Sequence, residues 1–210
     1  MRVFLIRHGR TAWNAQGLFQ GGRDIPLDAT GRDQVKAMAE KAAGIPFAVI
    51  WSSPLARARE TADALARKTG VEVCEHGGLS EIRHGKWEGL KAEVVARRWP
   101  RLFSLWHERP EEVVMPEGES LEDVQARSMR AMEDVTARER DPIAVVTHDA
   151  VIKVLLCTWL GLPLSRFRCF ELGNASITGV RLSKKRASLF LLGDTSWSET
   201  PYSRELQVSL

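Results

Sequence analysis

Four short segments of this chain combine residue types that could act on a phosphate group. The first is Arg7-His8-Gly9, which directly follows the apolar run Val3–Ile6. Such a run predicts a short buried strand, so the arginine and the histidine stand at its carboxyl end. Open α/β sheets bind their ligands at these ends. An arginine binds a phosphate dianion through two N–H groups, and a neutral imidazole can attack phosphorus.

The other three segments also lie where a predicted strand gives way to a loop or a helix. They are Ser52–Ala62 with Arg57, Leu79–Gly89 with Glu81, and Val145–Asp149 with His148. They add a second guanidinium, a carboxyl group and a second imidazole, which together could bind a phosphoryl group and protonate a leaving group.

Strands alternate with helices along most of the chain. The patterns predict strands at Val3–Ile6, Ala48–Trp51, Val71–Cys74 and Ile143–Val146, helices at Asp33–Ala43 (N-cap Thr30), Leu55–Thr69, Glu119–Glu139 and Asp149–Leu160, and a hairpin of Ile177–Arg181 and Ala187–Leu192 across Ser183–Arg186. This alternation predicts an α/β fold, a three-layer α/β/α sandwich around a mostly parallel central sheet.

The region of about 91–140 differs from the rest. It is charged, rich in helix formers and interrupted by Pro100, Pro110 and Pro116. We expect a helical insert there that caps the carboxyl edge of the sheet, within a single domain of residues 1–210.

Composition excludes several classes of protein. The formal net charge of the 210 residues is only +3, which does not favour a nucleic-acid or membrane partner. The three cysteines are widely spaced and form no metal or redox motif, and the apolar run near the start is too short for a signal peptide. We therefore expect a cytoplasmic protein without a metal or another cofactor.

Taken together, the four segments resemble the histidine phosphatase superfamily, the phosphoglycerate mutase-like proteins. The resemblance covers the family's four motifs in order and about 150 residues. It implies that His8 is the nucleophile and becomes a phosphohistidine, that Arg7, Arg57 and His148 bind the phosphoryl group, and that Glu81 is the acid and base. A neutral carboxylic acid is needed to protonate an alkoxide, so we expect the surroundings of Glu81 to raise its pKa.

The resemblance also implies a substrate pocket lined by Asn14, Gln20 and Gly21. His84, three residues after Glu81, could line the same pocket, although a buried structural histidine is the alternative. The residue after the Arg-His-Gly motif is usually Glu or Gln in the family, and here it is Arg10. Arg10 could bind a second anionic group of the substrate, or it could point away into solvent.

Two features favour a phosphatase over a mutase. The mutase branch usually has an arginine directly after the catalytic glutamate, where this chain has Ile82, and Met115–Leu121 resembles a segment common in phosphatases. The expected function is metal-independent hydrolysis of a small phosphorylated metabolite by a histidine acid-type phosphatase. The alternatives are a cofactor-dependent phosphoglycerate mutase, an α-ribazole phosphate phosphatase, and a silent phospho-ligand-binding protein. A homodimer is common in the family and stays open.

Overall fold

The computed structural model describes residues 1–138, 140–184 and 186–198. Its strands are β1 (Arg2–Arg7), β2 (Val49–Ser52), β3 (Val73–Glu75), β4 (Ile143–Thr147), β5 (Ile177–Leu182) and β6 (Ala187–Asp194). Its α-helices are α1 (Ala12–Gln16), α2 (Ala29–Ala42), α3 (Ala56–Thr69), α4 (Ala92–Arg98), α5 (Pro100–Glu108), α6 (Leu121–Arg138) and α7 (Asp149–Trp159). The predicted helix end at Glu139 and Lys185 of the predicted turn lie outside the described residues.

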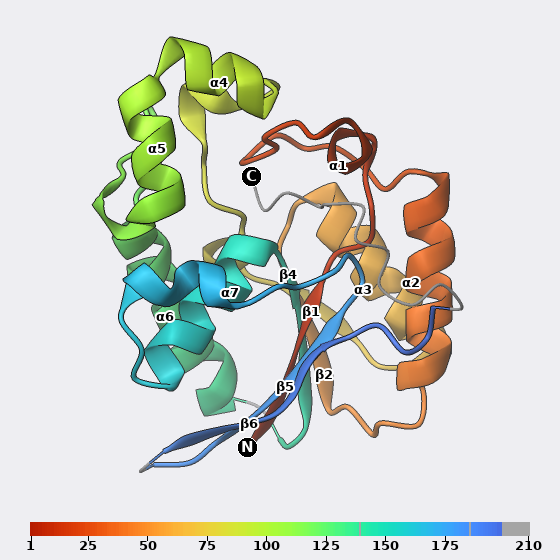
Figure 1. The fold of residues 1–210 in the computed structure, drawn as a ribbon. Coiled ribbons are helices and arrows are strands. Elements are labelled where there is room, and N and C mark those ends of the chain that lie inside the picture. Colours follow the sequence, from red (N-terminus) through yellow and green to blue (C-terminus); the bar gives the residue numbers. More distant parts are fainter. Residues whose placement is uncertain (139, 185, 199–210) are drawn as a thin grey trace.

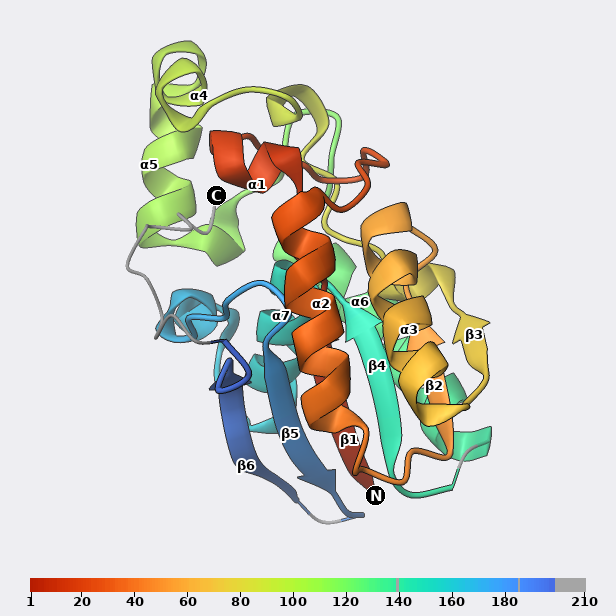
Figure 2. The same cartoon turned by 90° about the vertical axis from the view of Figure 1, so that its right-hand side faces the viewer.

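The strands form a six-stranded sheet in the order β3-β2-β4-β1-β5-β6 (Figures 1 and 2). The first four strands in this order are parallel, whereas β5 is antiparallel to both of its neighbours, β1 and β6. The predicted α/β fold with a mostly parallel sheet is confirmed. The antiparallel pair is the predicted hairpin, which extends the sheet on the β1 side.

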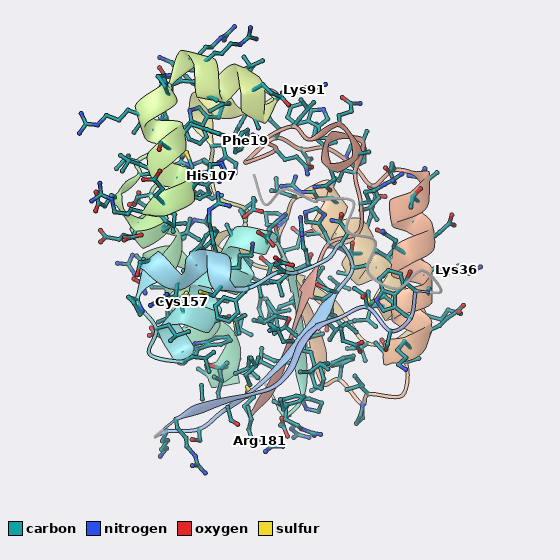
Figure 3. The ribbon with its side chains drawn as sticks, viewed as in Figure 1. Phe19, Lys36, Lys91, His107, Cys157 and Arg181 are labelled. Carbon is teal, nitrogen blue, oxygen red and sulfur yellow. The ribbon has the colours of Figure 1, made fainter. Side chains whose placement is uncertain are left out.

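Alternate residues of the central strands build two cores on opposite faces of the sheet. Ile6 on β1 and Val146 on β4 pack with α2 and α3, whereas Leu5 and Val145 pack with α6 and α7. Strands buried on both faces are continuously apolar, which explains why the sequence predicted β1 and β4. Figure 2 shows α2 and α3 in front of the sheet, and Figure 3 shows that Lys36 on the outer face of α2 points away from it.

The predicted helical insert divides into two parts with different roles. Helices α4 and α5 stand beyond the carboxyl edge of the sheet (Figure 1), as a cap would. Helix α6 instead belongs to the sandwich, because it lies beside α7 against the sheet (Figures 1 and 2), with Val124, Ala131 and Val135 buried. The cap therefore ends before α6, and the expected end of the insert at residue 140 is too far along the chain. The sequence did not reveal this because a cap helix and the outer face of a core helix are both rich in charged residues and helix formers.

The N-terminus of α2 differs from the prediction. Asp28, not Thr30, is the N-cap, and its carboxylate accepts the N–H of Gly31 at 2.7 Å. Gly31 lies so close to the loop after β1 that a Cβ atom there would lie 2.0 Å from the carbonyl oxygen of Arg10. The absence of a side chain at residue 31 thus lets α2 pack directly against the loop that follows His8.

Gly31→Ala is expected to lower the free energy of unfolding by about 1–3 kcal/mol, the usual cost of overpacking. Where the added methyl group meets no other atom, a glycine-to-alanine change would instead stabilise by about 0.4–1 kcal/mol. Gly44→Ala is the control, since no heavy atom lies within 4 Å of a Cβ at that position. Chemical denaturation measures both variants, and a Gly31→Ala protein as stable as wild type would contradict the packing described.

Candidate active site

Three adjacent parallel strands bring the predicted residues to one edge of the sheet. β1 ends at Arg7 and His8, and β4 lies next to it with Thr147 as the partner of Arg7. The backbone N–H of His8 still donates to the carbonyl of Thr147 at 3.0 Å, so the ladder extends to the predicted nucleophile. β2 lies on the other side of β4 and ends at Ser52. His8 and His148 therefore lie side by side, with ring centroids 5.1 Å apart.

The imidazole of His8 is buried and oriented by its own loop. Its Nδ1 lies 2.7 Å from the carbonyl oxygen of Gly9, which can only accept, so Nδ1 carries the proton and Nε2 has the free electron pair. Thr61 receives the N–H of Gly9 at 3.1 Å and holds that loop in place. Burial, together with the positive charges of Arg57 and Arg7, lowers the pKa of His8 well below its ordinary value. The ring is therefore unprotonated at neutral pH.

Two guanidinium groups lie beside this imidazole. Arg57, on the first turn of α3, is fully buried, and it donates to the carbonyls of Arg23 at 2.8 Å and Gly21 at 2.9 Å. Burial lowers the pKa of Arg57 to about 10. Arg7 lies 3.5 Å from the carboxylate of Asp149 and also donates to the carbonyl of Leu172. Arg57 thus stays cationic at neutral pH although its described partners are backbone carbonyls.

His148 is fully buried and held by Ser53. Its Nε2 lies 2.8 Å from the Ser53 hydroxyl. Burial and the charge of Arg57 lower the pKa of His148 well below its ordinary value. A neutral His148 in this position can donate or accept a hydrogen bond without adding a third charge.

Glu81 lies on an irregular segment after the short helical turn Gly77–Leu79. The backbone N–H of Ile82 donates to its carboxyl group at 3.0 Å. Burial and the nearby negative charge of Asp149 raise the pKa of Glu81, and Arg57 opposes this shift without cancelling it. The expectation that the surroundings raise the pKa of Glu81 is confirmed.

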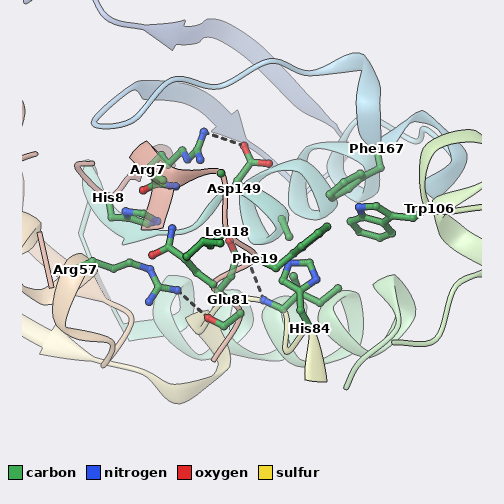
Figure 4. A pocket seen from close by; sticks show the side chains of 16 residues that line it. Arg7, His8, Leu18, Phe19, Arg57, Glu81, His84, Trp106, Asp149 and Phe167 are labelled. Atoms are coloured by element: carbon green, nitrogen blue, oxygen red, sulfur yellow. Dashed lines mark hydrogen bonds and ion pairs between the residues drawn. The ribbon is translucent and has the colours of Figure 1, made fainter. Parts of the chain in front are cut away.

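Arg7, His8, Arg57 and Glu81 line one pocket, shown in Figure 4, whereas His148 is not among its lining residues. Its charged lining residues face a wall of mostly apolar and aromatic side chains on the far side. The residues that line the pocket are Arg7, His8, Asn14, Gly17, Leu18, Phe19, Gln20, Gly21, Arg57, Glu81, Ile82, His84, Trp106, Asp149, Ala150 and Phe167.

Comparison with known proteins gives the family. Residues 3–195 match the histidine phosphatase superfamily (branch 1). The chain belongs to this superfamily. It is 33% identical over 93% of both chains to phosphoserine phosphatase 1 of Hydrogenobacter thermophilus, and 31% identical over 99% of both chains to a probable phosphoglycerate mutase, GpmB, of Escherichia coli O1:K1 / APEC. A mycobacterial glucosyl-3-phosphoglycerate phosphatase, solved with VO3, superposes with a TM-score of 0.85 at 30% identity, over 91% of this chain and 98% of the other.

The resemblance stated from the sequence is thus confirmed, and the chain is a phosphatase of the histidine phosphatase family. Members of the family act on small phosphorylated substrates. No described helix is long and apolar enough to cross a membrane.

The predicted substrate residues of this histidine phosphatase separate into two groups. Asn14, Gln20, Gly21 and His84 line the pocket, whereas Arg10 does not. Arg10 turns to α2, where it donates to Asp28 at 2.9 Å and to Thr30 at 2.7 Å. The helix-capping carboxylate that the sequence pattern missed satisfies this cation, so the geometry does not support Arg10 as a ligand of a second anionic group.

His84 is buried between aromatic rings. Its ring centroid lies 5.0 Å from that of Phe19 and 6.0 Å from that of Trp106. Burial, and the charge of Arg57, lower the pKa of His84 to about 3. His84 is therefore a neutral polar group in the wall of the pocket and adds no positive charge for a substrate anion.

Several site residues have no counterpart among the sequence predictions. Asp149 follows His148 directly, and its position in the first turn of α7 could have signalled a role near the phosphate. Trp106 comes from α5, and Phe167 comes from the short 3-10 helix Leu164–Cys169 far along the chain. Only packing brings them to the pocket, so spacing in the sequence gives no signal for them.

The ring of His8 is expected to stay neutral as the pH falls to about 6, because its folded pKa lies well below its ordinary value near 6.5. NMR titration of the assigned His8 ring resonances measures this directly. Protonation with a midpoint at or above 6.5 would contradict the electrostatic environment described.

Proposed function

We propose that this histidine phosphatase hydrolyses a small phosphomonoester in two steps through a phosphohistidine at His8. The observation that carries the proposal is the Nδ1 hydrogen bond to Gly9, since it leaves Nε2 of a neutral ring available between two buried arginines. Splitting one difficult displacement into two easier ones is the usual advantage of covalent catalysis.

In the first step, Nε2 of His8 forms a bond to phosphorus as the ester P–O bond breaks. The leaving alkoxide takes a proton from the carboxyl group of Glu81. The raised pKa of Glu81 supports this role, because it increases the fraction of the protonated form near neutral pH.

In the second step, water attacks the phosphohistidine and the P–N bond breaks. Glu81, now a carboxylate, takes a proton from the water, and inorganic phosphate leaves with His8 neutral again. Arg7, Arg57 and His148 bind the equatorial oxygens throughout. Positioning and charge neutralisation are the main requirements of phosphoryl transfer, and these side chains can meet both without a metal ion.

The charges of the residues that line the pocket limit the kind of leaving group that it can bind. Among the described lining residues the charged ones are Arg7, Arg57, Glu81 and Asp149. The two arginines face the phosphoryl position, and the carboxylate of Asp149 would repel a second anionic group, whereas Glu81 is protonated when the ester binds. We therefore propose a leaving group without negative charge, in contact with neutral side chains such as His84.

The proposed class of substrate helps to distinguish between the alternative functions. A phosphoglycerate mutase must bind a carboxylate, and Ile82 is buried and apolar at the position of the expected arginine. A phosphatase is therefore favoured. α-Ribazole phosphate carries an uncharged nucleoside, so a phosphatase specific for it remains an alternative within the proposed class.

Glycerol 3-phosphate and 3-phosphoglycerate differ in having a hydroxymethyl group or a carboxylate at the end distant from the phosphate. We expect kcat/KM to be about tenfold higher for glycerol 3-phosphate, since charge repulsion across the pocket is of the order of 1–2 kcal/mol. Phosphate release measures both reactions. A preference for 3-phosphoglycerate, or its conversion to 2-phosphoglycerate faster than its hydrolysis, would favour the mutase alternative.

His8→Ala is expected to lower kcat for p-nitrophenyl phosphate by about 10³-fold or more, because loss of the nucleophile removes the covalent route. His107→Ala is the matched control, since His107 is exposed on α5 and lies outside the pocket. Full activity of His8→Ala would show that the proposed mechanism is wrong.

A further inference from the structure

The segment that carries Glu81 is held against α6 by the side chains of Arg127 and Glu119, which also form an ion pair with each other. Arg127 and Glu119 form a two-pronged contact, with Nε to Oε1 at 2.9 Å and Nη2 to Oε2 at 3.1 Å. The Arg127 side chain is 23% exposed and that of Glu119 is 9% exposed, so water screens the pair only in part. A planar guanidinium with five N–H groups can make this contact and still donate elsewhere.

The remaining N–H groups of Arg127 donate to backbone carbonyls, two on the amino side of Glu81 and one at Glu81 itself. Nη1 donates to the carbonyls of Gly78 and Ser80, at 3.0 and 2.5 Å, and Nη2 donates to the carbonyl of Glu81 at 3.0 Å. Residues 80–83 form neither helix nor strand, so their backbone groups need partners of this kind. Arg127 therefore satisfies the carbonyl of the proposed acid and two carbonyls on its amino side.

Glu119 holds the carboxyl side of the same segment. Its Oε2 accepts the N–H of Arg83 at 2.9 Å, and its own N–H donates to the carbonyl of Arg83 at 2.9 Å. Gly78 allows the close approach of α6, because a Cβ atom there would lie 2.8 Å from the carbonyl oxygen of Arg127. The segment is thus bound on both sides of Glu81 by one pair of side chains.

The carboxyl group of Glu81 depends on this support. Its described hydrogen bond is to the N–H of the next residue, so the backbone position largely decides where the carboxyl group lies. We propose that Arg127, paired with Glu119, is a positioning residue that holds Glu81 at the distance needed to protonate the leaving group. This inference rests on the proposed role of Glu81 as the general acid.

The test uses two substrates that differ in their need for an acid. p-Nitrophenolate leaves readily without a proton, whereas the alkoxide of glycerol 3-phosphate does not. The parameter kcat/KM reports the steps up to phosphoenzyme formation, where the acid acts. We compare wild type with Arg127→Met, which keeps much of the apolar stem, and with Arg130→Met, an exposed arginine on the same helix.

Arg127→Met is expected to lower kcat/KM for glycerol 3-phosphate by about 10–100-fold, part of the 10²–10⁴-fold contribution of a general acid. The loss for p-nitrophenyl phosphate should be at least about tenfold smaller, and Arg130→Met should match wild type on both substrates. Equal losses on the two substrates would overturn the proposal, because they would indicate general damage to the fold.

Glu81→Gln separates failure of this inference from failure of the proposed function. If Glu81→Gln keeps full activity on glycerol 3-phosphate, Glu81 is not the acid and both proposals fall. If Glu81→Gln loses activity and Arg127→Met does not, only the positioning role is wrong. The double variant should be no slower on glycerol 3-phosphate than Glu81→Gln alone, whereas additive losses would show that Arg127 acts independently of Glu81 and would also overturn the proposal.

Discussion

The burial of positive charge beside an unprotonated imidazole is the constraint on which the rest of the site depends. Arg57 is fully buried and bound to backbone carbonyls, and Arg7 is buried next to it at the end of β1. Removing a guanidinium from water is costly unless an anion compensates it. Burial, together with these two charges, lowers the pKa of His8 and keeps its ring neutral. In the proposed mechanism, a phosphoryl group brings negative charge to these cations at the atom that a neutral imidazole can attack, so binding and nucleophilicity have one physical origin.

The acid must meet the opposite requirement, because it has to retain a proton within reach of the two arginines. Burial and Asp149 raise the pKa of Glu81, while Arg57 and Arg7 act against this shift. Asp149 is itself held as a carboxylate: burial would raise its pKa, but Lys153, at 2.7 Å, and Arg7 keep that pKa below its ordinary value. Asp149 thus partly neutralises Arg7 and also favours the protonated form of Glu81. The mechanism depends on this balance of charges across a few ångströms.

Features that depend on residues close together in the chain could be predicted from the sequence. The apolar runs of β1 and β4 predicted buried parallel strands, and the residues that follow them, His8 and His148, predicted the catalytic edge. Features that depend on contacts between distant segments could not be predicted from the sequence. Nothing near Arg10 indicates that Asp28 will bind it, and the regular pattern of α6 suits a cap helix as well as a core helix. The Arg127–Glu119 pair belongs to this second kind, since its partners at Gly78 to Arg83 lie more than thirty residues away.

The central claim is that phosphorus is bonded to His8 during turnover. Rapid acid-free quenching of the enzyme during hydrolysis of p-nitrophenyl phosphate, followed by peptide mass spectrometry, tests it most directly. We expect a phosphorylated peptide whose modification maps to the ring of His8, forms within one turnover and disappears when substrate is exhausted. A burst of p-nitrophenol without any modified peptide, or phosphorylation of another residue at the same rate, would contradict it.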